Sequence, residues 1–177
     1  MSLENAKQNL KEFGKELNLE GLAFDENHTC ILGIDNTFSL HLTYEPNSDR
    51  LYLYSPVLDG LPKDPQIRLK LYEALLEGSM LGGQMAGGGV GVAVPEELIL
   101  MHTVIEMGPG TDAKALCRMA PVFVDATEKW RDKAGKICDG IEVPREGPPG
   151  IPGQPGVVGP PPGAGPSQPG GDRFIKI

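Results

Sequence analysis

Residues 37–44 read TFSLHLTY, and apolar and polar side chains alternate through this stretch without interruption. The apolar positions are Phe38, Leu40, Leu42 and Tyr44, and the polar ones are Thr37, Ser39, His41 and Thr43. Successive side chains of a β-strand point to opposite faces, so this period of two predicts a strand with one buried face. It is the clearest strand signal in the chain.

Two further strands are expected on either side of this one. Residues 29–34 and 51–57 are short and rich in apolar side chains, and the segments that connect them, 35–36 (DN) and 45–49 (EPNSD), consist of typical turn residues. Strands joined by such short links pair antiparallel. The region from 29 to 57 is therefore predicted to be a three-stranded antiparallel meander.

Two helices are expected around this meander. The first is amphipathic, with Ser2 as its N-cap and one apolar stripe formed by Leu3, Ala6, Leu10, Phe13 and Leu17. The second covers 67–80 after an Asp64 cap and Pro65. Its apolar residues surround most of the cylinder, so packing against a sheet does not account for all of them. A second buried face, a dimer contact, is therefore predicted.

The second half of the body completes the order α-β-β-β-α-β-β-α. Residues 82–89 (GGQMAGGG) are expected to form a mobile loop, followed by strands at 90–94 and 98–106. A last helix is expected to start with Thr111 or Asp112 as its cap and to extend to Ile137. Pro121 predicts a kink or break near Ala120. The order indicates an α+β domain with a mainly antiparallel twisted sheet over residues 1–140.

The remaining residues, 141–177, are predicted to be a Pro/Gly-rich disordered tail, because 144–172 hold 10 prolines and 9 glycines. Residues 147–161 form five collagen-like triplets, and a collagen-like trimer is the less favoured interpretation. The final residues 173–177 (RFIKI) are compatible with docking on a sheet edge.

Charge and motif content narrow the function. Residues 1–143 carry 13 Lys and Arg against 22 Asp and Glu, which disfavours nucleic acid and anionic membranes as partners. The charged N-terminus is not signal-like and no apolar run is long enough for a membrane helix, so a cytoplasmic protein without membrane insertion is predicted.

No catalytic, metal-ligating or cofactor-binding motif is found, and we expect neither an enzyme nor a cofactor. The segment from Gly87 to Gly91 lacks the lysine and Ser/Thr of a phosphate-binding loop. The three histidines have no metal-ligand spacing. The three cysteines, Cys30, Cys117 and Cys138, are far apart and are interpreted as small buried apolar residues.

Several stretches of the body resemble a known family. FDENHTCILGID (24–35), FSLHLTYEPNSDRLYLYSPVLDGLP (38–62), LYEALLEGSMLGGQMAGGGVGVA (71–93) and LILMHTVIEM (98–107) resemble the class I type III secretion chaperones of the CesT/SycE type, and within them the SycE-like chaperones of chlamydiae. The resemblance covers about residues 1–140 and is most specific between Leu71 and Ala93. The collagen-like triplets depart from the family pattern.

This resemblance implies a homodimeric chaperone fold in the bacterial cytoplasm. It also implies partners: the N-terminal chaperone-binding segments of secreted effector proteins, which are kept extended, and the type III export ATPase. We assign effector binding to Leu10, Phe13, Ile31, Tyr52 and Tyr54, each of which could equally be ordinary core. The dimer contact is assigned, from the helix pattern and the resemblance together, to Leu69, Tyr72, Leu76, Met80, Val92 and Val94. The alternative is a structural or adaptor subunit that binds folded proteins.

Overall fold

The computed structural model describes residues 2–19, 21–144 and 174–175, the last two by their backbone only. Its helices are α1 (Ser2–Glu16), α2 (Pro65–Ser79) and α3 (Ala115–Cys138), with a short 3-10 turn η1 (Met80–Gly82) after α2. Its strands are β1 (Thr29–Ile34), β2 (Phe38–Glu45), β3 (Arg50–Asp59), β4 (Gly89–Ala93), β5 (Leu98–Glu106) and β6 (Phe174–Ile175). The predicted α+β order of elements is confirmed. The expected triplet tail lies outside the described residues.

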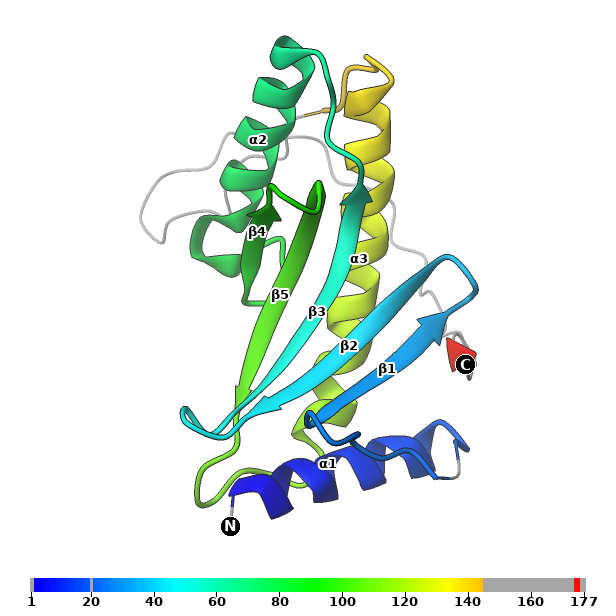
Figure 1. Ribbon diagram of the computed structural model, residues 1–177, viewed down its shortest axis with the longest axis vertical. Coiled ribbons are helices and arrows are strands. Elements are labelled where there is room, and N and C mark those ends of the chain that lie inside the picture. The colour runs from blue at the N-terminus through cyan, green and yellow to red at the C-terminus, as the bar shows by residue number, and fades with distance from the viewer. Residues whose placement is uncertain (1, 20, 145–173, 176–177) are drawn as a thin grey trace, which may run out of the picture.

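The strands form one antiparallel sheet in the order β4-β5-β3-β2-β1-β6. β1, β2 and β3 are the predicted meander, and β5 joins its other side by pairing with β3 along almost its whole length. In Figure 1 the β1–β2 hairpin crosses the direction of β5 at a clear angle, as expected from the twist of the sheet.

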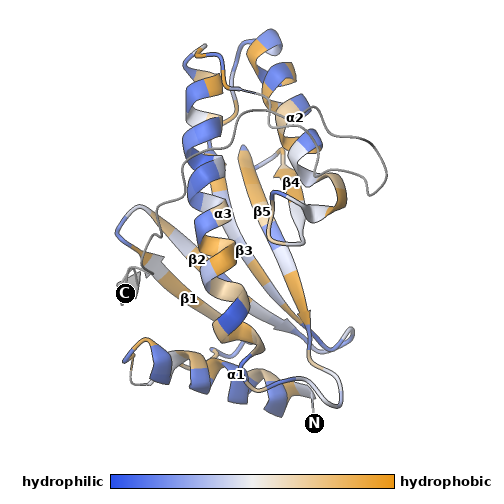
Figure 2. Cartoon of the chain, turned by 180° about the vertical axis from the view of Figure 1, so that it is seen from behind, coloured by the Kyte–Doolittle hydropathy of each residue, from blue (hydrophilic) through white to orange (hydrophobic). Residues whose placement is uncertain are grey.

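The core lies on one side of this sheet. Figures 1 and 2 show α3 running along that face while α1 crosses beneath the β1–β2 end. The strand residues that point toward the helices are fully buried: Leu40, Leu42, Leu51, Leu53, Ile99 and Met101. From α1 they meet Ala6, Leu10 and Phe13, which are at most 1% exposed. Removing this apolar surface from water is the main stabilising term of the domain.

The start of α2 follows the local sequence. The carboxylate of Asp64 accepts a hydrogen bond of 2.8 Å from the backbone N–H of Gln66, and Pro65 occupies the first helical turn, where its missing N–H costs nothing. The inner side of α2 packs against α3. There Gly78 lies so close to the indole of Trp130 that a Cβ at Gly78 would be 2.0 Å from the ring.

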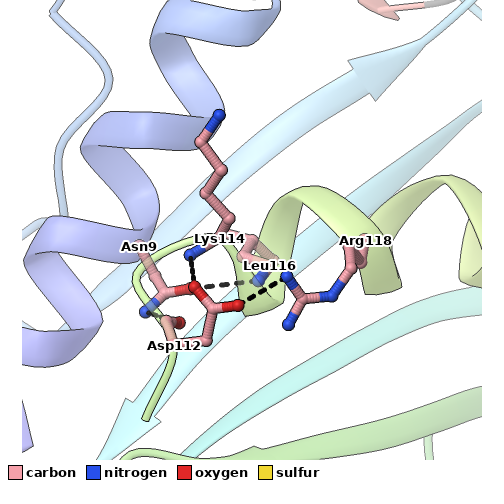
Figure 3. Close-up of polar contacts among 5 residues, drawn as sticks. All are labelled: Asn9, Asp112, Lys114, Leu116 and Arg118. Carbon is pink, nitrogen blue, oxygen red and sulfur yellow. Dashed lines mark hydrogen bonds and ion pairs between the residues drawn. The ribbon is translucent and has the colours of Figure 1, made fainter.

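The start of α3 differs from the prediction, because the helix begins at Ala115 after Lys114, and neither Thr111 nor Asp112 is its N-cap. Asp112 instead closes a turn by accepting the Lys114 N–H (2.9 Å), and it pairs with Arg118 (2.6 Å). The helical N–H of Leu116 is capped from α1: the side-chain oxygen of Asn9, which is fully buried, accepts it at 3.0 Å (Figure 3). A cap supplied from a distant helix leaves no local sequence signal.

Of the kink or break that Pro121 predicts near Ala120, the break is also wrong. α3 continues through Pro121 as one helix up to Cys138. A proline inside a helix costs about 3 kcal/mol through its lost hydrogen bond and steric contacts. The residues beside it, Ala120, Phe123 and Val124, are almost completely buried, and their packing against the core offsets that cost.

The glycine-rich segment after α2 is packed, contrary to the predicted mobility. Met85 is fully buried, and the Thr103 hydroxyl on β5 donates to the carbonyl of Ala86 at 3.1 Å. A Cβ at Gly88 would lie 1.8 Å from the carbonyl oxygen of His102, so only glycine fits there. These glycines allow close approach to β5 and do not act as a flexible linker.

Candidate protein-binding surfaces

Among the residues that the structure describes, no helix covers the side of the sheet opposite the core. We call this surface the open face and define it by Ile31, His41, Tyr52, Tyr54 and Val104. The alternation of each strand places these residues opposite the buried ones. The side chain of Ile31 is 47% exposed and that of Val104 is 37% exposed, whereas the two tyrosines are half-buried.

One row of side chains crosses four strands of the open face. The strand register sets Ile31 opposite His41, His41 opposite Tyr54, and Tyr54 opposite His102. The rings of His41 and Tyr54 are stacked, with centroids 4.8 Å apart and planes 23° from parallel. Stacked flat rings beside an exposed isoleucine form an apolar platform on an otherwise acidic domain.

Hydrogen bonds order this platform before anything binds. The Thr43 hydroxyl lies 2.9 Å from the Thr29 hydroxyl and 3.3 Å from the Tyr54 hydroxyl. The Ser39 hydroxyl lies 2.8 Å from Nε2 of His41. Burial lowers the pKa of His41 from its ordinary value, so the ring stays neutral at physiological pH. A neutral, fixed surface loses little side-chain entropy when a partner contacts it.

A second set of exposed apolar side chains lies on the outer side of α2, on η1, and on β4 and the residue that follows it. We call it the α2–β4 patch, and it comprises Leu69, Leu76, Met80, Leu81, Val92 and Val94. These side chains are between 39% and 88% exposed. Leu81 is the extreme case, since it is 88% exposed and has a left-handed backbone with φ of 54°. Clusters of exposed apolar side chains of this kind mark interaction surfaces.

The structure divides the residues assigned to effector binding. Ile31, Tyr52 and Tyr54 lie on the open face, whereas Leu10 and Phe13 are in the core, each 1% exposed. Of the residues assigned to the dimer contact, five are exposed members of the α2–β4 patch, whereas Tyr72 is half-buried and packs against the core.

Sequence reasoning missed three residues of these surfaces. Val104 and His41 could have been found, because the period of two places each on the side opposite the buried strand residues. Leu81 had no such signal, since a left-handed backbone at a non-glycine residue depends on the surrounding fold.

Two properties of the described residues bear on metal binding and on cysteine chemistry. No group of three or more His, Cys, Asp or Glu side chains among them is arranged to hold a metal ion. Burial raises the pKa of the Cys30 thiol to about 11 and that of Cys117 to about 12, so both are protonated and weak nucleophiles. No helix in the described part is long and apolar enough to cross a membrane.

Solved structures with the same fold define the class of protein. A chain of the HopA1–SchA chaperone–effector complex matches with a TM-score of 0.58 and 26% identity, over 73% of this chain and 97% of that one. A chain of the ExsC–ExsE complex matches with a TM-score of 0.60 and 17% identity, over 73% and 92%. A third match is to the Yersinia pestis type III secretion chaperone SycH in complex with a fragment of YscM2, with a TM-score of 0.53, 18% identity, and coverage of 71% and 98%. The fold is that of the type III secretion chaperones.

The sequence itself places the chain within a family. The model of the Tir chaperone protein (CesT) family matches residues 8–131, which is most of the chain, and the chain belongs to this family. No curated protein matches it significantly. The resemblance stated from the sequence is thus confirmed at the level of the family.

Proposed function

We propose that this chain is a cytoplasmic type III secretion chaperone of bacteria. It binds the N-terminal segments of secreted effector proteins, keeps them extended and catalyses no reaction. The observation that carries the proposal is the open face, an ordered apolar platform left uncovered on a fold shared with chains of chaperone–effector complexes. Exposed apolar patches on a folded domain mark surfaces that bind partners.

The proposed binding mode follows from the geometry of the open face. An extended segment laid across the strands brings alternate side chains onto Ile31, Tyr54 and Val104. Because the platform runs over several strands, a chain without globular structure makes more contacts than a compact one. Ordering that chain costs free energy, which limits affinity and favours release at the secretion apparatus. Leu10 and Phe13 are left out of this contact surface because they are buried.

The homodimer is proposed to form through the α2–β4 patch. The inner side of α2 is used by the core through Leu71, Leu75 and Gly78, so Leu76 and its outer neighbours have no covering element within the described chain. A second copy of the same patch would bury them by two-fold pairing. Delivery to the export ATPase is proposed from the family resemblance alone.

The first experiment is to capture the tagged chain from its native lysate, identify the co-purifying proteins and measure masses by light scattering. The expected result is a dimer that holds one copy of a secreted protein through its N-terminal segment. A monomer or trimer, or a dimer enriched only in folded cytosolic proteins, would contradict the proposal and favour an adaptor subunit.

A variant tests the dimer contact. Leu76→Glu places a charge on the α2–β4 patch and is expected to yield monomers by light scattering, because burial of an unpaired carboxylate opposes association. Val122→Glu adds the same charge at an exposed apolar position of α3, 55% exposed, and is expected to remain dimeric. If both variants have the same mass, the patch is not the contact.

A further inference from the structure

The outer edge of β1 is not open along its whole length, because the end of the chain pairs with it. β6 lies antiparallel to β1, with Gly33 opposite Ile175 and Ile34 opposite Phe174. In Figure 1, β6 is the red arrow beside the end of β1. An exposed strand edge is a template for any extended peptide, and proteins commonly protect such edges. Here the protecting element is β6.

The hydrogen-bond pattern shows which backbone groups β6 reaches. The Tyr44 N–H of β2 donates to the His28 carbonyl, so even-numbered residues of β1 direct their backbone groups toward β2 and odd-numbered residues toward the outer edge. Among the odd-numbered residues, Thr29 is already bonded to Asp25 through its N–H and its carbonyl (both 2.8 Å). The edge therefore has two positions for an incoming strand, Ile31 and Gly33, and β6 lies opposite Gly33.

Charge and tethering favour the chain's own end as the occupant. Arg173 and Lys176 flank the two paired residues in sequence, whereas β1 is followed directly by Asp35 and the body is strongly acidic. The 29 residues between Pro144 and Phe174 attach this segment to the same molecule. Tethering of this kind keeps a segment at an effective concentration of up to about 1 mM.

We propose that β6 (Phe174–Ile175) is a built-in strand that occupies the edge of β1 and gives way when an extended segment of a partner pairs there. The displacement of β6 by a partner rests on the proposed function, whereas the occupation of the edge by β6 does not. Ile31 belongs to both the edge and the open face, so a partner lying on the platform is already next to the edge. A longer strand gains bonds at Ile31 as well as Gly33, and this favours displacement of the short β6.

Hydrogen exchange of the backbone amides in the full chain tests whether β6 occupies the edge of β1. In Ile175→Pro the residue opposite Gly33 has no N–H, so the pairing is lost and the Gly33 amide should exchange about tenfold faster. Ile175→Val keeps the N–H and should leave the Gly33 rate unchanged. The Leu32 amide faces β2 and is an internal control that should not change in either variant. Equal Gly33 rates in all three chains would overturn the proposal.

A peptide probe tests competition for the same edge. A labelled peptide with the sequence of residues 171–177 (GDRFIKI) should bind the full-length Ile175→Pro variant at least about tenfold more tightly than the unaltered chain, whose edge is occupied. The same peptide with proline at the position of Ile175 should bind neither. Equal binding of the first peptide to both chains would overturn the proposal.

The displacement of β6 is tested with the secreted segment found by capture from the lysate. Its binding should slow hydrogen exchange of the Ile31 amide in the unaltered chain and should release the labelled peptide GDRFIKI from Ile175→Pro. It should also bind Ile175→Pro more tightly than Ile175→Val. Equal affinity for the two variants would overturn the proposed displacement of β6. If capture yields no secreted partner, the proposed function fails, and the amide and peptide results still decide whether the segment occupies the edge.

Discussion

β3 presents two different surfaces to its surroundings. Leu51 and Leu53 point to α3 and are fully buried, whereas Tyr52 and Tyr54 alternate with them and point to the open face. The same ten-residue strand, Arg50–Asp59, thus serves the core with one set of positions and offers the other set to a partner. Hydrophobicity alone does not separate the two roles. The helices determine which role each set of positions has, because α1 and α3 cover only one side of the sheet.

The largest expected effect comes from the covered side. Leu53→Ala should lower the free energy of unfolding by about 2–5 kcal/mol, since it removes a fully buried side chain and leaves a cavity. Tyr54→Ala changes the next residue of β3, which points to the open face, and should lower the free energy of unfolding by less than about 1 kcal/mol. Urea unfolding followed by circular dichroism measures both values. Similar losses would mean that the open face is part of the stabilising core.

The next effect extends the comparison to the two sides of α2. Gly78→Ala should destabilise by about 1–3 kcal/mol, because the new Cβ would lie 2.0 Å from Trp130 and force the helices apart. Glu73→Ala, at an exposed position of the same helix, should stay within about 0.5 kcal/mol. Thermal unfolding distinguishes them. An unchanged Gly78→Ala protein would contradict the close packing of α2 on α3.

A smaller change in stability but a clear change in binding is expected on the open face. Tyr54→Ala should weaken binding of the captured effector segment by about tenfold, as truncation of a central aromatic contact commonly does. Tyr54→Phe keeps the stacked ring, loses only the contact of its hydroxyl with Thr43, and should retain most of the affinity. Isothermal titration calorimetry measures the dissociation constants of both variants. Full affinity in Tyr54→Ala would exclude the platform as the binding surface.

The smallest effect concerns pH. Burial lowers the folded-state pKa of His41 below its ordinary value of 6.5, so the unfolded chain takes up a proton first as the pH falls. Stability from this group is therefore complete above about pH 6.5 and decreases as the pH falls from there toward the folded-state pKa. Urea unfolding between pH 7.5 and 5 should show a steeper loss in the unaltered chain than in His41→Gln. Parallel curves would contradict this role.

Much of the fold could be predicted because its signals are local. The alternation in 37–44, the turn residues after Ile34 and the Asp64-Pro65 cap each act within a few residues, and the structure confirms the elements that they predict. The exposed apolar side of α2 could also be predicted from the sequence, since a helix that is apolar all round needs a second covering surface.

The errors arise where distant residues determine the local structure. α3 begins late because its cap is Asn9 on another helix, and it passes Pro121 because buried neighbours compensate. The glycines at 82–88 suggested mobility, yet β5 approaches so closely at Gly88 that no side chain fits. Phe13 was indistinguishable from a surface contact residue, because burial depends on which helix covers which strand. Each outcome depends on tertiary packing that no sequence window contains.

The amide of Asn9 has a consequence for the order in which the molecule is made. Its hydrogen bond to the Leu116 N–H joins residues 107 positions apart, and its Nδ2 donates to the Asp112 carbonyl at 3.1 Å. At ordinary rates of synthesis, α1 leaves the ribosome about 5–20 s before α3 can complete these bonds. During that time its apolar stripe has no final partner. Although α1 is translated before α3, its Asn9 contacts form only after α3 has been made, and a nascent-chain factor that shields α1 would act in this interval.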